Sequence, residues 1–164
     1  ARYKSGKYTI ERPLHLGASL AIIDRKERSQ LVNVLSAYGL PLGEAFQLRD
    51  DMLGIFGDPS VTGKPAGDDL REGKRTVLMA MTMEKASDAA RAELTANLGN
   101  PSLSAEKIES LRTLIVETGA IADVEKLIDR LGEESVAAAH SAAINESARP
   151  FLLALAETAI RRSY

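Results

Sequence analysis

The chain has 164 residues, a length that suits one domain able to bury about two-thirds of its unfolded surface. Its 21 basic and 23 acidic residues give a formal net charge of −2, and this near-balance argues against a nucleic-acid-binding protein, which usually carries a basic excess. The absence of Cys excludes disulfide scaffolds, thiolate zinc sites and cysteine nucleophiles, and two His far apart in sequence argue against a His-rich metal site. No segment approaches the ~18 apolar residues of a membrane-spanning helix, and no secretory leader is visible.

Composition and periodicity predict an all-helical protein. Ala, Leu, Glu, Lys and Arg dominate, and apolar runs of period two are absent. We predict a first helix from Pro13, a charged turn over residues 24–28, and a second helix that stops at Gly39. The next helix is expected to start at Pro41 and to end near residues 55–57.

Residues 58–69 are predicted to form an irregular loop, because they contain two Pro and two Gly. Long loops in compact domains are commonly functional. Helix is expected again around Leu70 and over residues 77–81, about 88–98 and about 104–117. Apolar residues at helical spacing over 121–131 predict a helix that ends before Gly132. An Ala-rich helix over 136–144 and a last helix over 151–160 are expected to follow.

The segment most informative about chemistry is FQLRDDMLG, residues 46–54. On a helix, Gln47 and Asp51 share one face and Asp50 lies beside it. Adjacent carboxylates repel each other unless a cation lies between them, and Mg²⁺ bound to phosphate oxygens would meet that need. The alternative is a solvent-exposed pair, which is the more frequent situation for an isolated Asp-Asp.

Two lysine-containing segments flank this helix in sequence. Lys64 lies between Gly63 and Pro65, where glycine allows close approach of the backbone to an anion and lysine supplies a mobile positive charge. Near the start, Lys4 and Lys7 surround Ser5 and Gly6 and could also cradle a phosphate. Taken singly, each segment could equally be ordinary loop polarity or a chain end.

Taken together and in order, these segments resemble one family. The string FQLRDDMLGIFGDPSVTGKPAGDDLREGKRT is similar to the second aspartate-rich region and following loop of trans-isoprenyl diphosphate synthases, the polyprenyl synthetase family of geranylgeranyl and farnesyl diphosphate synthases. The opening YKSGKYT resembles the upstream Lys-Thr segment of that family, with Ser5 in place of Thr. The resemblance implies the helical bundle of isoprenoid synthases and a Mg²⁺-dependent transferase of isoprenoid biosynthesis. Such an enzyme condenses isopentenyl diphosphate with an allylic diphosphate to make a longer prenyl diphosphate.

The resemblance also implies roles for individual residues. Asp50 and Asp51 would hold Mg²⁺, and Asp69 would position the loop and the lysines around it. The lysines would neutralise the leaving diphosphate, while hydroxyl and amide oxygens would lie near the allylic carbons. The implied substrate-binding set is Lys4, Ser5, Gln47, Lys64 and Lys74, and the implied catalytic set within it is Lys4, Ser5, Gln47 and Lys64.

Two departures from the family pattern shape the interpretation. Gly54 stands where the family's second motif has a third Asp, which should weaken one metal site without abolishing it. The family's first Asp-rich motif does not precede Lys4 in this sequence. We therefore interpret residues 1–164 as a single all-helical domain, the C-terminal half of a synthase, expected to be inactive alone.

The resemblance further implies a homodimer. The absence of Cys permits the cytoplasmic location that we expect, and the near-balanced charge argues against nucleic-acid partners. An alternative function is a non-catalytic half-synthase that acts as a helical partner subunit. A terpene cyclase of the same fold is less compatible, because cyclases usually carry an Asn/Asp, Ser and Glu metal motif in the second position. The combination of Asp50 and Asp51 with the Gly-Lys loop favours chain elongation.

Overall fold

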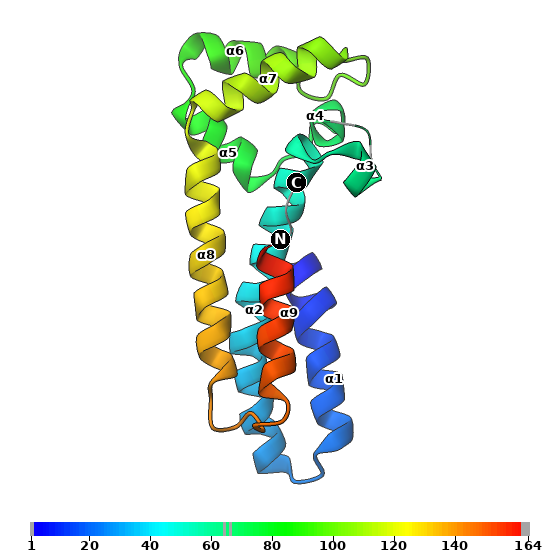
Figure 1. The fold of residues 1–164 in the computed structure, drawn as a ribbon, viewed down its shortest axis with the longest axis vertical. Helices are drawn as coiled ribbons and strands as arrows, with labels where there is room; N and C mark the ends of the chain where they lie inside the picture. Colours follow the sequence, from blue (N-terminus) through cyan, green and yellow to red (C-terminus); the bar gives the residue numbers. More distant parts are fainter. Residues whose placement is uncertain (1, 64, 66, 162–164) are drawn as a thin grey trace. The chain divides into compact units, whose positions relative to one another are not determined.

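The structure is a computed structural model that describes residues 2–63, 65 and 67–161. Within these residues all regular structure is helical and no strand is present, which confirms the predicted fold class (Figure 1). None of the described helices is long and apolar enough to cross a lipid bilayer. The elements in chain order are the π-helix η1 (Arg2–Glu11) and the α-helices α1 (Arg12–Ala21), α2 (Arg25–Phe56), α3 (Pro59–Thr62), α4 (Asp68–Glu72), α5 (Val77–Lys85), α6 (Asp88–Asn97), α7 (Ala105–Glu117), α8 (Ala120–Ala139) and α9 (Arg149–Ile160).

Internal contacts divide the chain into two compact units. Among the described residues, unit 1 comprises 2–47 and 127–161, and unit 2 comprises those between 48 and 126. Helices α2 and α8 therefore each contribute residues to both units, and each unit is described by itself. The expectation of a single domain over residues 1–164 stays a prediction.

Helix α2 is longer than the sequence predicted. It begins at Arg25, where the Asp24 carboxylate accepts a 2.8 Å hydrogen bond from the Glu27 backbone N–H. The break between the helices lies at residues 22–24, so the turn predicted over 24–28 is wrong for residues 25–28, which are helical. The predicted stop at Gly39 and restart at Pro41 are wrong, because the helix continues through both residues. Pro41 removes one amide donor, and so one hydrogen bond, from the helix. The helix persists because a neighbouring face of α2 is fully buried, and the packing of that face outweighs the lost hydrogen bond. The buried residues on this face are Tyr38, Leu42 and Ala45.

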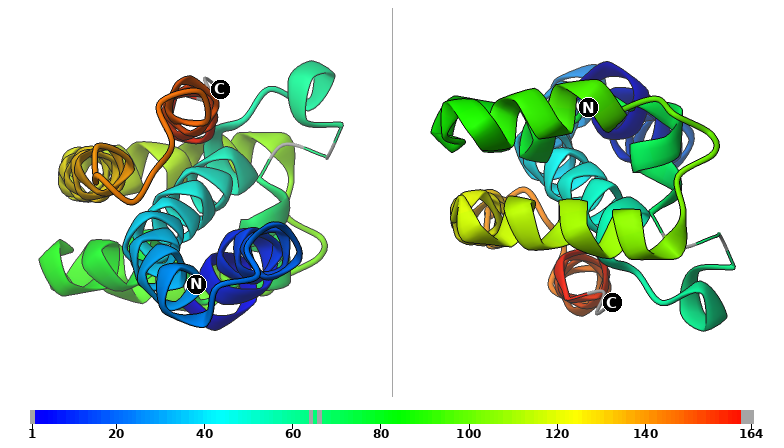
Figure 2. Two further views of the ribbon diagram at one scale, coloured as in Figure 1. Left: turned by 90° about the horizontal axis from the view of Figure 1, so that it is seen from below. Right: turned by 90° about the horizontal axis from the view of Figure 1, so that it is seen from above.

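Helix α8 also passes a predicted boundary. The expected end before Gly132 and the separate helix over 136–144 are wrong, since α8 continues to Ala139. Gly132 serves as a contact point, because a Cβ atom there would lie 2.5 Å from Cδ1 of Ile160 on α9. A residue without a side chain lets the two helices approach closely. Figures 1 and 2 show the C-terminal part of α8 and α9 running side by side in opposite directions.

The core of unit 1 joins α2 to the end of α8 and to α9. The Tyr38 hydroxyl donates a 2.7 Å hydrogen bond to the Leu152 carbonyl, and the Ser135 hydroxyl donates one of 2.9 Å to the Tyr38 carbonyl. These two bonds tie α2 to both C-terminal helices. The buried residues of this cluster are Tyr38, Leu42, Ala139, Ala156 and Ala159.

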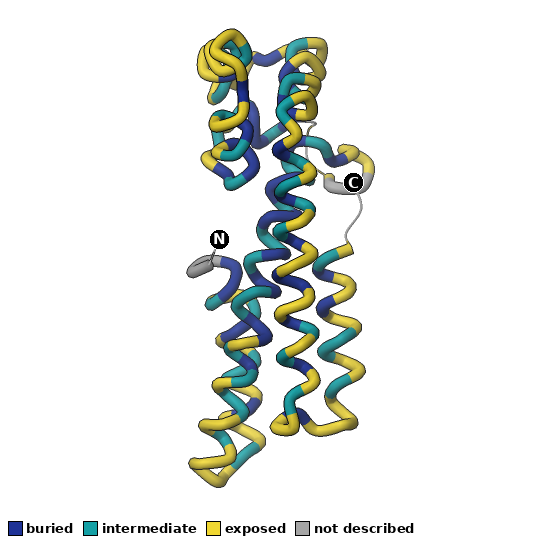
Figure 3. Tube along the Cα trace, turned by 90° about the vertical axis from the view of Figure 1, so that its left-hand side faces the viewer, coloured by how far each residue is buried: buried dark blue, intermediate teal, exposed yellow. Residues whose placement is uncertain are grey.

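Helix α1 contributes less to the core. Figure 3 shows that the turn between α1 and α2 is largely exposed. Leu16, Leu20 and Ile23 are exposed apolar side chains on this part of the chain, whereas Ala18 is buried.

Glycines of α2 allow η1 to lie directly on the helix backbone. A Cβ atom at Gly43 would lie 2.8 Å from the Gly6 nitrogen and closer still to the Gly6 Cα, and one at Gly39 would lie 3.2 Å from the Glu11 Cα. Gly39 and Gly43 are four residues apart and so face the same side of α2. The backbone of η1 therefore rests against the backbone of α2, and this contact fixes the position of Ser5.

We expect Gly43→Ala to destabilise unit 1, because the new methyl group must push η1 away from α2. The expected loss is about 1–3 kcal/mol of unfolding free energy, as for other overpacked sites. Thermal denaturation followed by circular dichroism measures the loss. The control is Gly17→Ala on α1, where an added Cβ meets nothing within 4 Å and should leave stability equal or slightly higher. Equal melting temperatures for the Gly43→Ala variant and the unsubstituted chain would contradict the backbone contact.

Burial raises the pKa of Tyr38 from 10.0 to about 12. The unfolded chain therefore releases this phenolic proton first, so the free energy of unfolding should fall as pH rises from about 10 and this contribution should be lost near pH 12. An alkaline titration followed by tyrosinate absorbance should show a transition at about pH 12 in the unsubstituted chain, and Tyr38→Phe should lack it. Tyr8→Phe, which alters an exposed ring, should retain that transition.

Candidate functional site

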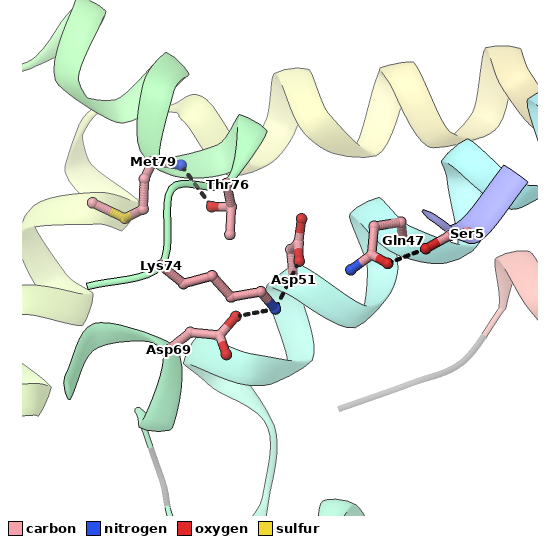
Figure 4. A network of polar contacts seen from close by, with 7 residues as sticks. All are labelled: Ser5, Gln47, Asp51, Asp69, Lys74, Thr76 and Met79. Atoms are coloured by element: carbon pink, nitrogen blue, oxygen red, sulfur yellow. Dashed lines mark hydrogen bonds and ion pairs between the residues drawn. The ribbon is translucent and has the colours of Figure 1, made fainter. Parts of the chain in front are cut away.

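A lysine bridges two carboxylates in unit 2 (Figure 4). The Lys74 Nζ lies 3.0 Å from Oδ1 of Asp51 on α2 and 3.0 Å from Oδ2 of Asp69 on α4. Asp51 is 6% exposed and Asp69 is 4% exposed, so neither carboxylate belongs to a solvated surface pair. Asp50 is half-buried beside Asp51. We call Asp51, Asp69 and Lys74 the acid–lysine cluster.

Charge pairing keeps the Lys74 ammonium protonated. Burial alone would lower the pKa of Lys74, but the hydrogen bonds to Asp69 and Asp51 and the negative charges of both outweigh it and hold the pKa above its ordinary value. Its side chain is 35% exposed, so the ammonium has carboxylates on one side and access to solvent on the other. A permanently charged donor placed this way can bind an anion that approaches from solvent.

The local fold of residues 67–76 returns Lys74 to Asp69. Gly67 and Gly73 flank α4 with φ angles of +68° and +65°, a backbone region that glycine adopts without strain. The Lys74 backbone N–H then donates a 3.0 Å hydrogen bond to the Asp69 carbonyl. Thr76 caps α5, because its hydroxyl accepts a 3.1 Å hydrogen bond from the Met79 N–H. The irregular loop predicted over residues 58–69 thus contains the short helix α3, which ends at Gly63, and α4 agrees with the helix predicted around Leu70.

A second polar pair lies in unit 1. The Ser5 hydroxyl donates a short hydrogen bond to Oε1 of Gln47 on α2, and Ser5 is buried (Figure 4). The close backbone contact between Gly6 and Gly43 holds Ser5 in reach of Gln47. The sequence predicted roles for both residues, and the structure brings these two together.

Arg49 is a site neighbour that sequence reasoning missed. Its guanidinium makes two hydrogen bonds to Glu125 on α8, of 2.6 and 2.7 Å, and Arg49 is only 8% exposed. Two parallel bonds of this kind fix geometry as well as charge. The signal in the sequence was an arginine directly before two aspartates, but its partner lies 76 residues away and no local pattern identifies it.

Arg112 supports the end of the same helix in unit 2. Its Nε donates a 2.7 Å hydrogen bond to the Ile55 carbonyl, and its guanidinium lies 6.0 Å from the centre of the Phe56 ring. The last carbonyls of a helix have no partner within the helix, so a cation there stabilises the terminus. This contact fixes the end of α2 near the acidic residues.

Some predicted residues cannot be placed. Lys64 lies outside the described residues, and the side chain of Lys4 is also outside them, although its backbone belongs to η1. Among the described residues, no three His, Cys, Asp or Glu side chains gather into a group that could hold a metal ion alone. The proposed metal roles of Asp50 and Asp51 therefore stay predictions.

The sequence profile of the polyprenyl synthetase family matches residues 1–115. The chain is 40% identical over 98 residues to a geranylgeranyl diphosphate synthase of Saccharolobus solfataricus, which covers 60% of this chain and 30% of that protein. It is 34% identical over 148 residues to a geranylgeranyl diphosphate synthase of Mycobacterium tuberculosis, which covers 90% of this chain and 40% of that protein.

A solved structure agrees with these sequence matches. The geranylgeranyl pyrophosphate synthase of Corynebacterium glutamicum, complexed with isoprenyl diphosphate and magnesium, superposes with a TM-score of 0.91 at 45% identity over 99% of this chain and 45% of that chain. The fold is therefore that of the helical prenyl synthases. The chain belongs to the polyprenyl synthetase family, and it spans less than half the length of each of these three proteins.

We expect Arg49 and Glu125 to be energetically coupled. Arg49→Lys keeps the charge but cannot form two parallel hydrogen bonds, so it should lower the unfolding free energy by about 1 kcal/mol or more. A double-mutant cycle with Glu125→Gln isolates the coupling. The exposed pair Arg161 and Glu157, 3.4 Å apart, is the matched control and should show a coupling near zero. Equal couplings for the two pairs would contradict a special role for the buried one.

Proposed function

We propose that this chain forms the diphosphate-binding part of a Mg²⁺-dependent trans-prenyltransferase that condenses isopentenyl diphosphate with an allylic diphosphate. The observation that carries the proposal is the acid–lysine cluster, in which a protonated ammonium and two buried carboxylates converge. The segment containing it, residues 46–76, carries the motifs by which the chain resembles the family, and it lies within the matched residues.

The donor atoms fit magnesium. Asp50 and Asp51 supply hard carboxylate oxygens, and magnesium is typically held by one or two carboxylates together with substrate phosphates and water. When bound, the ion would neutralise charge on the diphosphate and make it a better leaving group.

The residues of the chain would assist ionisation by electrostatics. In the proposed reaction the bond between the allylic carbon and the diphosphate oxygen breaks, and the diphosphate leaves with the bonding electrons. Lys74 would present its ammonium to the departing anion, and Lys4 and Lys64 would add positive charge. Donors fixed before the reaction need no reorganisation as charge develops, and this is commonly the largest contribution to catalysis.

Ser5 and Gln47 would act on the hydrocarbon side of the reaction. The hydrogen bond from Ser5 orients the Gln47 amide, and we place the oxygen atoms of both near the allylic carbons. Their dipoles would stabilise the positive charge that remains there. The double bond of isopentenyl diphosphate then forms the new carbon–carbon bond, and a proton is lost to complete the longer prenyl diphosphate. The implied homodimer and cytoplasmic location stay predictions.

The test uses the complete gene product that contains this sequence. With Mg²⁺, isopentenyl diphosphate and an allylic diphosphate it should yield a longer prenyl diphosphate, detected by chromatography. Asp51→Asn should lower kcat by about 10²-fold or more, because the proposed metal site loses one negative ligand and Lys74 loses one of its two carboxylate partners. Asp88→Asn changes a fully exposed carboxylate and should leave kcat unchanged. Absence of product from well-folded protein would reject the proposal.

A further inference from the structure

The link between Arg49 and Glu125 holds α2 from the side opposite to the acid–lysine cluster. An α-helix turns by about 100° per residue, so the side chains at positions 49 and 51 leave α2 about 160° apart. Arg49 binds Glu125 on α8 through two hydrogen bonds of 2.6 and 2.7 Å, whereas Oδ1 of Asp51 lies 3.0 Å from Lys74 Nζ. Asp50 comes between them around the helix, about 100° from each. This stretch of α2 is therefore held on two nearly opposite sides.

The two holds differ in what they restrain. Lys74 offers one ammonium, which is partly exposed and is shared between two carboxylates. Arg49 is buried, and two nitrogens of its guanidinium bind the two oxygens of one carboxylate. A planar fork of this kind fixes direction as well as distance, which a single ammonium does not. The arginine link also lies on the far side of the helix, so it can persist while Lys74 exchanges partners with an anion.

Stability alone would not require an ion pair at this place. The cost of removing two charges from water offsets much of their attraction, and a well-packed apolar pair of similar size is often as stable or more so. What an apolar pair lacks is direction, because the hydrophobic effect is non-directional. The contribution that distinguishes Arg49 and Glu125 from such a pair is therefore geometric.

We propose that Arg49 is a positioning residue, whose link to Glu125 fixes the rotation of α2 about its own axis and so the directions of the Asp50 and Asp51 carboxylates. The inference rests on the proposed function, because it assigns these carboxylates to the binding of Mg²⁺ and diphosphate. A rotation of about 15° would move an atom about 6 Å from the helix axis by roughly 1.5 Å. Magnesium demands near-ideal geometry, so a shift of that size would disrupt coordination.

The first experiment measures binding in the complete gene product by calorimetry with Mn²⁺ and inorganic pyrophosphate. Arg49→Met/Glu125→Leu replaces the fork by an apolar contact. Its melting temperature should be equal or higher, whereas its affinity should fall by about tenfold, as it does when groups that orient metal ligands are lost. Arg49→Lys is a second variant, which keeps the charge but not the fork and should also lose affinity.

The matched control removes another ion pair between helices of unit 2. Lys107→Met/Glu93→Leu breaks the pair that joins α7 to α6 and should bind Mn²⁺ and pyrophosphate as the unsubstituted protein does. Unchanged affinity in Arg49→Met/Glu125→Leu and in Arg49→Lys would overturn the inference. An equal loss in the control would do the same, because the effect would then not be specific to the link on α2.

The second experiment needs no ligand. A double-mutant cycle with Asp51→Asn and Lys74→Met, followed by urea unfolding, measures the coupling between these two residues. The cycle is repeated in the Arg49→Met/Glu125→Leu background, where the coupling should be smaller because Asp51 is no longer held toward Lys74. Independent contributions to stability add, so a link that only stabilises the fold would leave the coupling unchanged. Equal couplings in the two backgrounds would refute the assignment.

The two experiments separate the inference from the function on which it rests. If the unsubstituted protein binds no Mn²⁺ and pyrophosphate, the proposed function fails. The unfolding cycle then still decides whether Arg49 positions Asp51. If the unsubstituted protein binds both and the two couplings are equal, the inference fails and the proposed function stands.

Discussion

The structure of unit 2 depends on the pairing of one ammonium with two buried carboxylates. Isolated charges are costly to bury, and they persist in a protein interior only when they are paired and hydrogen-bonded. Asp51 and Asp69 meet this condition through Lys74, which binds one oxygen of each at 3.0 Å. The partial exposure of the lysine means that the pairing can also meet an anion from outside.

The elements around the cluster are arranged to hold it. Helix α2 carries Asp51, and Arg112 binds the Ile55 carbonyl near its end. Glycines at both ends of α4 turn the chain so that Lys74 comes back to Asp69. Arg49 adds a bidentate link from α2 to Glu125 on α8. Each contact restrains one element, so the charged groups are held by surroundings that are themselves fixed.

Much of the fold could be predicted from the sequence, because helix periodicity and capping are local signals. The ends of α6 and α7 agree with the predicted ranges, and the serine caps at Ser87 and Ser104 mark their starts. The stops predicted at Gly39 and Gly132 failed because a glycine has two uses. Judged from its sequence neighbours alone, a glycine indicates the end of a helix. Gly39 and Gly132 instead lie inside helices, at points where another helix packs closely against them. Only tertiary contact distinguishes these uses.

The site was predictable in part for a similar reason. The adjacent aspartates and the order of the surrounding motifs can be identified in the sequence itself, and from them Asp51 and Lys74 were predicted as site residues. The link between Arg49 and Glu125 joins residues that are 76 positions apart, so it could not be inferred from the sequence without coordinates.

The contact between η1 and α2 has a consequence for how this protein can vary. The two segments meet through main-chain atoms at Gly6 and Gly43, so the place of the Ser5 hydroxyl is set by the chain itself and depends little on the size of nearby side chains. Side chains around this contact can therefore be exchanged while the Ser5 hydroxyl and the Gln47 amide stay within hydrogen-bonding reach of each other. A main-chain contact of this kind lets the neighbouring side chains vary without moving the polar pair.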